Sequence, residues 1–425
     1  MVVEGKDRYN TMEKIEFDGY KYIDGGVCAA KGFKANGLNC GYNPDKNKND
    51  LCLLVSDVVC NAAGVFTQNK VKGAPVVVCK EHLQATGGKA RAVIANSKNA
   101  NTCNADGHEK AEKMCTLTAD VLGIDSKEVL VASTGVIGQI IPIEPVETHI
   151  EELAEGLSAD GNAKAANAIM TTDTFPKEVA VLFKIGDKTC HLGGMGKGSG
   201  MIHPNMATTL NFITTDVAIS SELLKKALLD IVKVTYNCLS VDGDQSTNDT
   251  LLVMANGLSG NDEIVVENDD YEIFKQALYI VMMNITKLLA RDGEGATKVL
   301  ECTCTGAKDI DTAITVAKSV ICSPLLKCAM FGEDANWGRI LCAIGYADAE
   351  FDIDKVDVDI ASKKGTLGVC RGGSGIEFSE DFAKEVLAEE EIFININLND
   401  GDSVAKAWGC DLTYDYVKIN GDYRS

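Results

Sequence analysis

Short apolar runs alternate with segments of helical periodicity along the whole chain, and this alternation predicts a mixed α/β fold. The apolar runs predict strands at Leu51–Val55, Pro75–Val78, Ala92–Ala95, Val129–Ser133, Val179–Ile185, Leu251–Met254, Phe351–Ile360 and Ile392–Asn397. The periodic segments predict helices at His108–Leu122, Glu144–Gly156, Ala163–Met170, Glu222–Cys238, Glu272–Leu289, Ala307–Ser319 and Glu380–Ala388. No repeat and no linker rich in proline or serine separates these elements, so we expect one packed body.

Composition and charge narrow the classes of function. Hydrophobic residues make up 45% of the 425 residues, which excludes wholesale disorder. The chain carries 62 acidic and 41 basic residues, and its formal net charge of −21 repels phosphate backbones and anionic lipid. We therefore expect no nucleic acid and no membrane as partner. Because no run of about 18 apolar residues and no signal-peptide pattern occurs, we also expect a cytoplasmic protein.

The 16 cysteines and five histidines do not form a metal-ligand pattern, since no CxxC pair occurs and the histidines are scattered. In a large chain without an export signal, the cysteines are expected to be reduced and mostly buried. The sequence therefore predicts no metal site.

The least ordinary stretch of sequence is a glycine-rich strip around Lys197, with glycines at positions 193, 194, 196, 198 and 200. Lys197 is followed by Gly198, so the strip lacks the Gly-Lys-Ser/Thr ending of a Walker phosphate loop. It also fails the GxGxxG dinucleotide pattern. The simpler interpretation is a glycine-rich connection into a buried strand.

A second interpretation makes Thr208 a latent nucleophile. A threonine hydroxyl is weak unless a base takes its proton, and one known arrangement uses the α-amine of the same residue. That amine exists only after the Ala207–Thr208 peptide bond is cut, and its reference pKa of about 7.7–8.0 suits a base near neutral pH.

The segment KGSGMIHPNMATTL, Lys197 to Leu210, resembles the ornithine acetyltransferase family, the bifunctional glutamate N-acetyltransferases of arginine biosynthesis. Further matching motifs follow in the family's order along the chain. They are ANSKNAN (Ala95–Asn101), ASTGVIG (Ala132–Gly138), TTDTFPK (Thr171–Lys177), SVDGDQSTNDT (Ser240–Thr250), RDGEGATK (Arg291–Lys298), GEDANWGR (Gly332–Arg339) and YVKINGDYRS (Tyr416–Ser425). Within these motifs, Lys98 stands where glycine is common, Thr209 where methionine is common, and Ser425 where threonine is common.

The resemblance implies a protein that cuts itself between Ala207 and Thr208. The products would be an α piece, 1–207, and a β piece, 208–425, which stay associated as two of each. The implied fold is α/β, with layered sheets and helices in an outline similar to the N-terminal-nucleophile hydrolases but with distinct connectivity.

The resemblance also implies a reaction and a set of site residues. Thr208 would take the acetyl group of N-acetylornithine and pass it to glutamate, without a cofactor, and acetyl-CoA is a further candidate donor. Thr134 and Gly135 would supply the oxyanion hole, although their spacing alone also fits an ordinary strand-ending turn. The implied substrate contacts are Thr171, Lys197, Thr208, Glu294, Asn420 and Ser425. Without the resemblance, Lys197 and Glu294 are interpreted as solvated loop charges.

Three other features are interpreted as structural. His203 lies near Thr208 in sequence, but an α-amine base removes the need for it. Trp337 is expected to pack, and Asp242 and Asp244 to form a polar turn.

Two alternatives to the acetyltransferase stay open at the level of sequence. One is a hydrolase or aminopeptidase that uses the same self-processed threonine, and the other is an uncut amino-acid-binding protein.

Overall fold

The structure is a computed structural model that describes residues 14–203 and 209–421 of the chain. It divides into two compact units, which are described separately. The first unit comprises the described residues of Met1–Gly198, Asn205–Lys233 and Gln245–Ile285. The second comprises those of Ser199–Pro204, Val234–Asp244 and Thr286–Ser425. These are units of packing, so they do not test the predicted cleavage pieces 1–207 and 208–425.

The first unit is built on a sheet whose nine described strands run in the order β1-β6-β7-β8-β10-β3-β4-β5, with β2 beside β3. The strands are β1 Lys21–Ile23, β2 Phe33–Leu38, β3 Leu51–Phe66, β4 Lys89–Asn96, β5 Val129–Ser133, β6 Lys177–Ile185, β7 Lys188–Lys197, β8 Leu210–Thr215 and β10 Thr250–Ala255. In this sheet β7 and β8 are antiparallel, and Lys197 pairs with Leu210. The end of the glycine-rich strip therefore lies beside the strand that begins two residues after Thr208.

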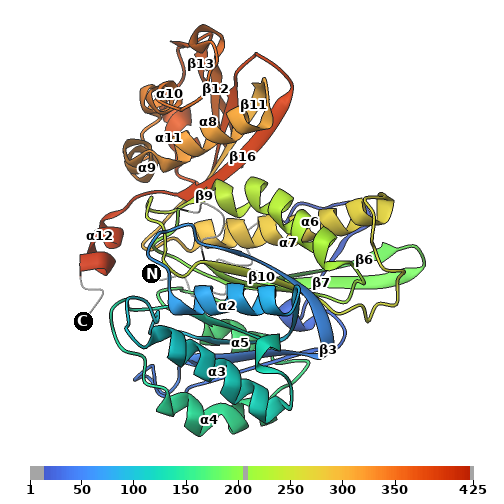
Figure 1. Ribbon diagram of the computed structural model, residues 1–425. Coiled ribbons are helices and arrows are strands. Elements are labelled where there is room, and N and C mark those ends of the chain that lie inside the picture. The colour runs from blue at the N-terminus through green and yellow to red at the C-terminus, as the bar shows by residue number, and fades with distance from the viewer. Residues whose placement is uncertain (1–13, 204–208, 422–425) are drawn as a thin grey trace. The chain divides into compact units, whose positions relative to one another are not determined.

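Helices cover the first unit's sheet in two groups. Their bounds are α2 Ala74–Ala85, α3 Gly107–Leu122, α4 Glu144–Glu155, α5 Asn162–Ala168, α6 Ser221–Val234 and α7 Asp269–Arg291, the last two ending in the second unit. Figure 1 shows α6 and α7 side by side, and an ion pair of 3.9 Å between Lys275 and Asp230 joins them. The helices α2 and α3 contact β5. Short 3₁₀ turns occur at η1 Gly26–Cys28 and η2 Ser126–Glu128.

The second unit has a sheet with seven described strands in the order β14-β13-β12-β15-β11-β16-β9. The strands are β9 Leu239–Ser240, β11 Val299–Ala307, β12 Asp357–Ser362, β13 Gly365–Arg371, β14 Ser374–Gly375, β15 Glu391–Asn397 and β16 Ser403–Cys410. Its helices are α8 Ile310–Cys322, α9 Pro324–Phe331, α10 Trp337–Gly345, α11 Glu380–Leu387 and α12 Tyr414–Gly421, with 3₁₀ turns η3 Tyr236–Cys238 and η4 Ile353–Lys355. Because α8 packs on β16 and β11, this unit is also layered, and the predicted α/β class of layered sheets and helices is confirmed.

Two strand predictions and two helix boundaries are wrong, and one strand is much longer than predicted. The helix predicted at Glu222–Cys238 ends at Val234, and residues 236–238 form the turn η3. The strand predicted at Leu51–Val55 continues as β3 to Phe66. The run Pro75–Val78 lies in helix α2, because proline suits the first helical turn and the valines of this run that face inward are buried. Within Phe351–Ile360 the strand begins only at Asp357, and residues 353–355 form the turn η4, capped by Asp352. The helix predicted from Ala307 begins at Ile310, since Asp309 caps it and Ala307 still belongs to β11.

Burial explains two features of the composition. Among the described residues, α7 is the one unbroken helix long and apolar enough to cross a membrane, yet 78% of its most apolar window is buried within the protein, as in a core helix. All 16 cysteines are free thiols, and twelve of them are buried. The prediction that the cysteines are mostly buried is confirmed.

Candidate active site

Thr134 and Gly135 directly follow strand β5 and present two different hydrogen-bond donors. The Thr134 N–H donates to Asn96 O at 3.0 Å, so the remaining donor of this residue is its hydroxyl. The Gly135 N–H has no hydrogen-bond partner within residues 14–203 and 209–421. Gly135 has φ of 134°, and a Cβ there would meet the carbonyl of Lys98, so only glycine fits. A hydroxyl and a backbone N–H are donors of the kind that stabilise an oxyanion.

Lys197 ends strand β7 with its ammonium beside Thr134. Its side chain is 9% exposed, and Nζ lies 3.4 Å from Thr134 Oγ1. Because the ammonium donates to this oxygen, the Thr134 hydroxyl proton points elsewhere and stays available as a donor. The structure therefore brings together two residues that lie 63 positions apart in sequence and were predicted for one site.

The carboxylate of Asp173 holds both Lys197 and Thr171 in the first unit. Its Oδ1 accepts from Lys177 Nζ at 2.6 Å and from the Gly198 N–H at 2.7 Å. Its Oδ2 accepts from the Thr171 N–H at 3.0 Å and lies 3.9 Å from Lys197 Nζ. Sequence reasoning missed Asp173 and Lys177, although their spacing of four residues and opposite charges inside TTDTFPK were a usable signal.

Burial disfavours the charged form of Asp173, and the neighbouring cations and hydrogen-bond donors stabilise that form. Desolvation alone would raise the pKa of this carboxyl, because its side chain is fully buried. The charges of Lys177 and Lys197 and the hydrogen bonds from Lys177 and Gly198 outweigh that effect and hold the pKa below its ordinary value. The group is therefore an anion at neutral pH, and it keeps two nearby ammonium groups compensated.

Glu294 and Asn420 come together in the second unit. Glu294 is buried, its N–H donates to Ser199 O at 2.9 Å, and its Oε2 accepts from Asn420 Nδ2 at 2.7 Å. A Cβ on Gly200 would meet the Glu294 carboxylate, so glycine is required for this close approach. Glu294 is therefore not the freely solvated loop charge that its spacing alone allowed.

Three predicted site residues, Ala207, Thr208 and Ser425, lie outside the described residues. The neighbouring Thr209 is described and buried. Its carbonyl accepts from the Thr250 N–H at 2.8 Å, and its hydroxyl accepts from Asn211 Nδ2. The Thr209 hydroxyl is thus engaged with a side chain of strand β8.

His203 and Asp242 have the structural surroundings that the sequence predicted. His203 Nδ1 lies 3.1 Å from Ser240 Oγ and 3.6 Å from Cys322 Sγ, and burial and the charge of Lys318 lower its pKa to about 4. Asp242 accepts from the N–H groups of Met201 and Ile202, at 2.6 Å and 2.9 Å, as expected of a polar turn.

Lys98 shows why glycine is common at its position in the family's motif. Its φ of 74° lies in the left-handed region, which costs less for glycine than for a residue with a Cβ. Trp337 packs against Gly375, where a Cβ would meet its ring, so packing accounts for this residue as predicted.

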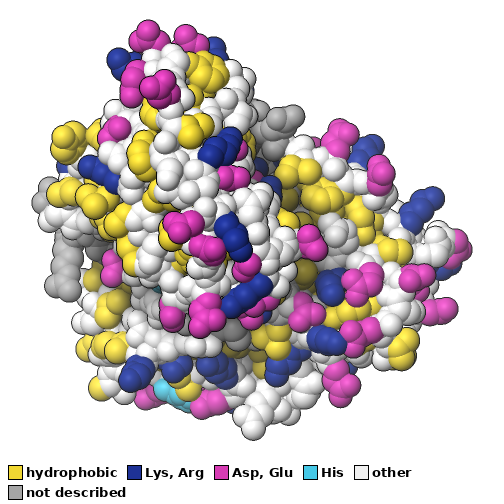
Figure 2. Space-filling model, turned by 90° about the horizontal axis from the view of Figure 1, so that it is seen from above, with side chains coloured by type: hydrophobic (Ala, Val, Ile, Leu, Met, Phe, Trp, Pro, Cys, Tyr) yellow, Lys and Arg dark blue, Asp and Glu magenta, His cyan; other side chains and the backbone are white. Residues whose placement is uncertain are grey.

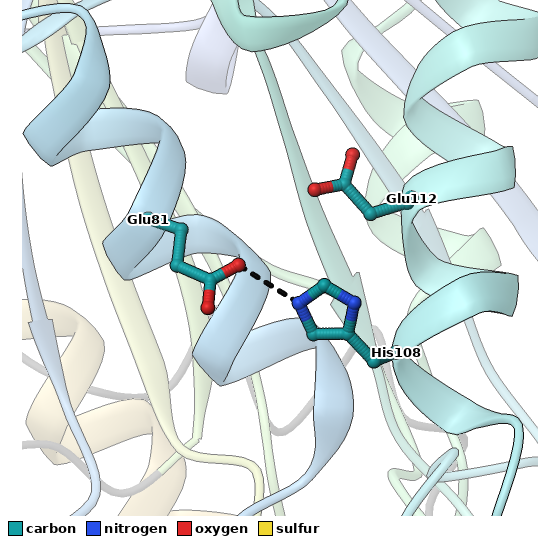
Figure 3. A group of neighbouring side chains, drawn as sticks. All are labelled: Glu81, His108 and Glu112. Atoms are coloured by element: carbon teal, nitrogen blue, oxygen red, sulfur yellow. Dashed lines mark hydrogen bonds and ion pairs between the residues drawn. The ribbon is translucent and has the colours of Figure 1, made fainter.

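One group in the described chain has the geometry to hold a metal ion. Glu81 on α2 and His108 and Glu112 on α3 point toward one another in Figure 3, with their ligand atoms within 4.8 Å. Glu81 and His108 are exposed and pair at 2.8 Å, while Glu112 lies 3.0 Å from Lys127 Nζ and 3.2 Å from His82 Nε2. The Lys127 ammonium opposes a further cation there, so the group is explained as an ion-pair network.

The face of the protein in Figure 2 shows acidic and basic side chains interspersed, without a continuous basic patch.

Comparison with known proteins covers almost the whole chain. The model of the ArgJ family matches residues 34–425. The chain is 51% identical over 394 residues to the arginine biosynthesis bifunctional protein ArgJ 1 of Clostridium acetobutylicum, which covers 92% of this chain and 96% of that protein. It is 49% identical over 404 residues to the corresponding protein of Caldanaerobacter subterraneus subsp. tengcongensis, covering 95% of this chain and 99% of that protein.

Among solved structures, a chain of the arginine biosynthesis bifunctional protein ArgJ of Bacillus halodurans is 44% identical, with a TM-score of 0.47, and covers 49% of this chain and 97% of that chain. The family match and the alignments with the two relatives each cover far more of the chain than the individual motifs do. They confirm the resemblance inferred from those motifs and the prediction of an enzyme of the acyltransferase class. This chain belongs to the ArgJ family.

Proposed function

We propose that this chain transfers the acetyl group of N2-acetylornithine to glutamate through an acetyl-Thr208 intermediate, after self-cleavage between Ala207 and Thr208. The observation that carries the proposal is the contact of Lys197 with Thr134, at 3.4 Å, where a buried cation adjoins the expected oxyanion donors. A cation at that place suits a substrate that carries a carboxylate, as both acetylornithine and glutamate do.

Self-cleavage begins the proposed chemistry. Thr208 Oγ attacks the Ala207 carbonyl, the peptide C–N bond breaks, and water hydrolyses the resulting ester to leave a Thr208 α-amine. That amine then takes the proton of the Thr208 hydroxyl as Oγ attacks the acetyl carbonyl. The amide C–N bond breaks, ornithine leaves with the proton on its amine, and glutamate's amine displaces the threonine oxygen in the second half-reaction.

Negative charge develops on the acetyl oxygen in both half-reactions. The Thr134 hydroxyl and the Gly135 N–H are the donors that we assign to it, since the Thr134 N–H is engaged with Asn96 O. One such donor contributes about 3–4 kcal/mol to lowering the barrier. We assign Lys197 to a substrate carboxylate and Glu294 to a substrate ammonium, with Thr171, Asn420 and Ser425 as further contacts.

Ornithine release with and without glutamate tests the transferase assignment. The proposal expects release that depends on glutamate and acetylglutamate formed in equal amount, with ping-pong kinetics. Release at one rate with or without glutamate, accompanied by free acetate, would instead identify a threonine-nucleophile hydrolase. Thr208→Ala is expected to remain one uncut chain and to release no ornithine. An uncut wild type that still binds amino acids would identify a binding protein.

Three finer properties belong to the same proposal. Acetyl-CoA is a second acetyl donor, which release of free CoA thiol in the presence of glutamate would test. The enzyme works in the cytoplasm without a resident cofactor or metal, and dialysis against a chelator is expected to leave its rate unchanged. Two α and two β pieces associate, and the mass of the native particle measured by light scattering checks this number.

A further inference from the structure

We propose that Asp173 is a positioning residue of the acyl-transfer site, which holds the Lys197 ammonium and the N–H groups of Gly198 and Thr171 in one arrangement, with Lys177 as its buried counter-ion. The inference rests on the proposed function for the roles of Lys197 and Thr171. It assigns roles to two side chains that neither the motifs nor the relatives' names assign.

Lys177 and Lys197 lie at different distances from the Asp173 carboxylate, and this difference indicates different roles. Lys177 Nζ lies 2.6 Å from Asp173 Oδ1, and both side chains are 0% exposed, so this is a closed buried pair. Lys197 Nζ lies 3.9 Å from Oδ2 and donates instead to Thr134 Oγ1. Lys197 is therefore held at charge-pair distance from the carboxylate, while its ammonium points to the residue assigned to the oxyanion.

The same carboxylate also joins two segments of backbone. It accepts from the Thr171 N–H, ahead of strand β6, and from the Gly198 N–H, directly after strand β7. Buried N–H groups need an acceptor, and two oxygens of one rigid group fix the segments relative to each other. In Asp173→Asn one oxygen becomes an NH₂ group, which faces donors and repels them.

A structural role alone makes a different prediction. If Asp173 only neutralised Lys177, then removing both charges together would restore the site. Asp173→Asn combined with Lys177→Gln removes both charges and nearly conserves volume, so it leaves no unpaired buried ion and keeps the test open should Asp173→Asn alone fail to fold.

Titration of Lys197 is the first readout. Lysine labelled with ¹³C at Cε is followed by NMR against pH in the full chain, and Lys197→Arg assigns the signal. In the double variant the pKa of Lys197 is expected to fall, by less than in Asp173→Asn, because the ammonium loses the carboxylate at 3.9 Å while the loss of the Lys177 charge opposes part of that effect. A pKa that stays at the wild-type value would overturn the proposal.

The kinetic readout separates substrate binding from chemistry. In the double variant the KM for N2-acetylornithine is expected to rise at least about tenfold, while kcat changes less. As the pH is raised, 1/KM is expected to decline at a lower pH than in the wild type, because Lys197 loses its proton earlier. A wild-type KM in the double variant would refute the positioning role. The matched control is Asp187→Asn with Lys188→Gln, an exposed ion pair at 3.2 Å in the same unit, which is expected to change neither readout.

The two readouts also separate this inference from the proposed function. If the wild type transfers no acetyl group but the Lys197 titration shifts in the double variant, the proposed function fails and the coupling of Asp173 to Lys197 stands. If the wild type transfers acetyl normally and neither readout changes in the double variant, only the positioning role fails.

Discussion

The two charged side chains predicted to bind substrate are held by different physical means. In the first unit, Lys197 lies 3.9 Å from the buried Asp173 carboxylate, which Lys177 neutralises. In the second unit, Glu294 is held by its N–H bond to Ser199 O and by Asn420 from the exposed helix α12. Buried charges therefore fix the cation, whereas hydrogen bonds with uncharged partners fix the anion.

This difference has a consequence for how each residue can respond to substrate. Rearranging a buried ion pair costs several kcal/mol, because each ion would lose its partner in a medium of low polarity. A hydrogen bond from an exposed asparagine is exchanged for water at little net cost. We infer that the Lys197 region is preorganised and that the Glu294 contact with Asn420 is adjustable.

The largest expected effect is on stability. Asp173→Asn leaves Lys177 buried without its partner and is expected to lower the free energy of unfolding by about 3–5 kcal/mol. The matched change in the other unit, Glu294→Gln, keeps an oxygen that can accept from Asn420 and is expected to cost about 1 kcal/mol. Urea unfolding of both variants at pH 7 measures the difference, and equal losses would contradict the comparison.

Acid adds a second test of the same pair. The folded pKa of Asp173 lies below its unfolded value of about 3.9, so its contribution to stability is full above that pH and is lost as the pH falls below it. The stability of the wild type should therefore fall more steeply below about pH 4 than that of Asp173→Asn.

The next effect concerns Gly135 and its oxyanion donor. Gly135→Ala places a Cβ against the Lys98 carbonyl and displaces the N–H, so kcat is expected to fall by about 10²–10³. Gly138→Ala is the matched control, because Gly138 also has positive φ, 79°, but open space around it. Steady-state ornithine release measures both, and a similar loss in the two variants would assign the effect to backbone strain alone.

Lys197→Met tests the preorganised cation directly. A charged hydrogen bond contributes about 1.5–3 kcal/mol, so KM for acetylornithine is expected to rise by about 10- to 150-fold. Lys188→Met, at a partly exposed lysine of the same strand, should leave KM unchanged. An unchanged KM in Lys197→Met would remove this residue from the binding site.

Asn420→Ala gives the smallest effect. Loss of its bond to Glu294 is expected to raise KM by about 2- to 10-fold, corresponding to about 0.5–1.5 kcal/mol, and to leave the unfolding free energy nearly unchanged because Asn420 is exposed. A larger increase in KM than that of Lys197→Met would reverse the comparison between the two regions.

Much of the fold could be predicted from periodicity, and the failures have local causes. The buried run Val129–Ser133 was predicted to its end residues, because an apolar segment bounded by turn residues fits a central strand. The strand predicted at Pro75–Val78 is a helix, because valines are found on a buried helix face as well as in a strand. The glycines before Lys197 suggested a connection, but residues 188–197 form strand β7.

The candidate site was predicted mainly from ordered motifs, not from physical chemistry. Spacing alone could not show that Lys197 contacts Thr134 across 63 positions, because long-range contacts depend on strand order. Asp173 was missed because it resembles a surface charge until the structure shows its burial. Nothing in the described residues tests Thr208 or Ser425, so their roles stay predictions.

The most direct test of the account is the covalent state of the working enzyme. Intact mass and N-terminal sequencing of purified, active protein are predicted to show two polypeptides, the second beginning Thr-Thr-Leu-Asn-Phe at position 208. The Thr208→Ala variant should give one chain of 45.3 kDa, apart from the small mass change of the substitution. Full acetyltransferase activity in a wild-type preparation that contains only the unbroken chain would contradict the account, because no free α-amine would then be present at Thr208.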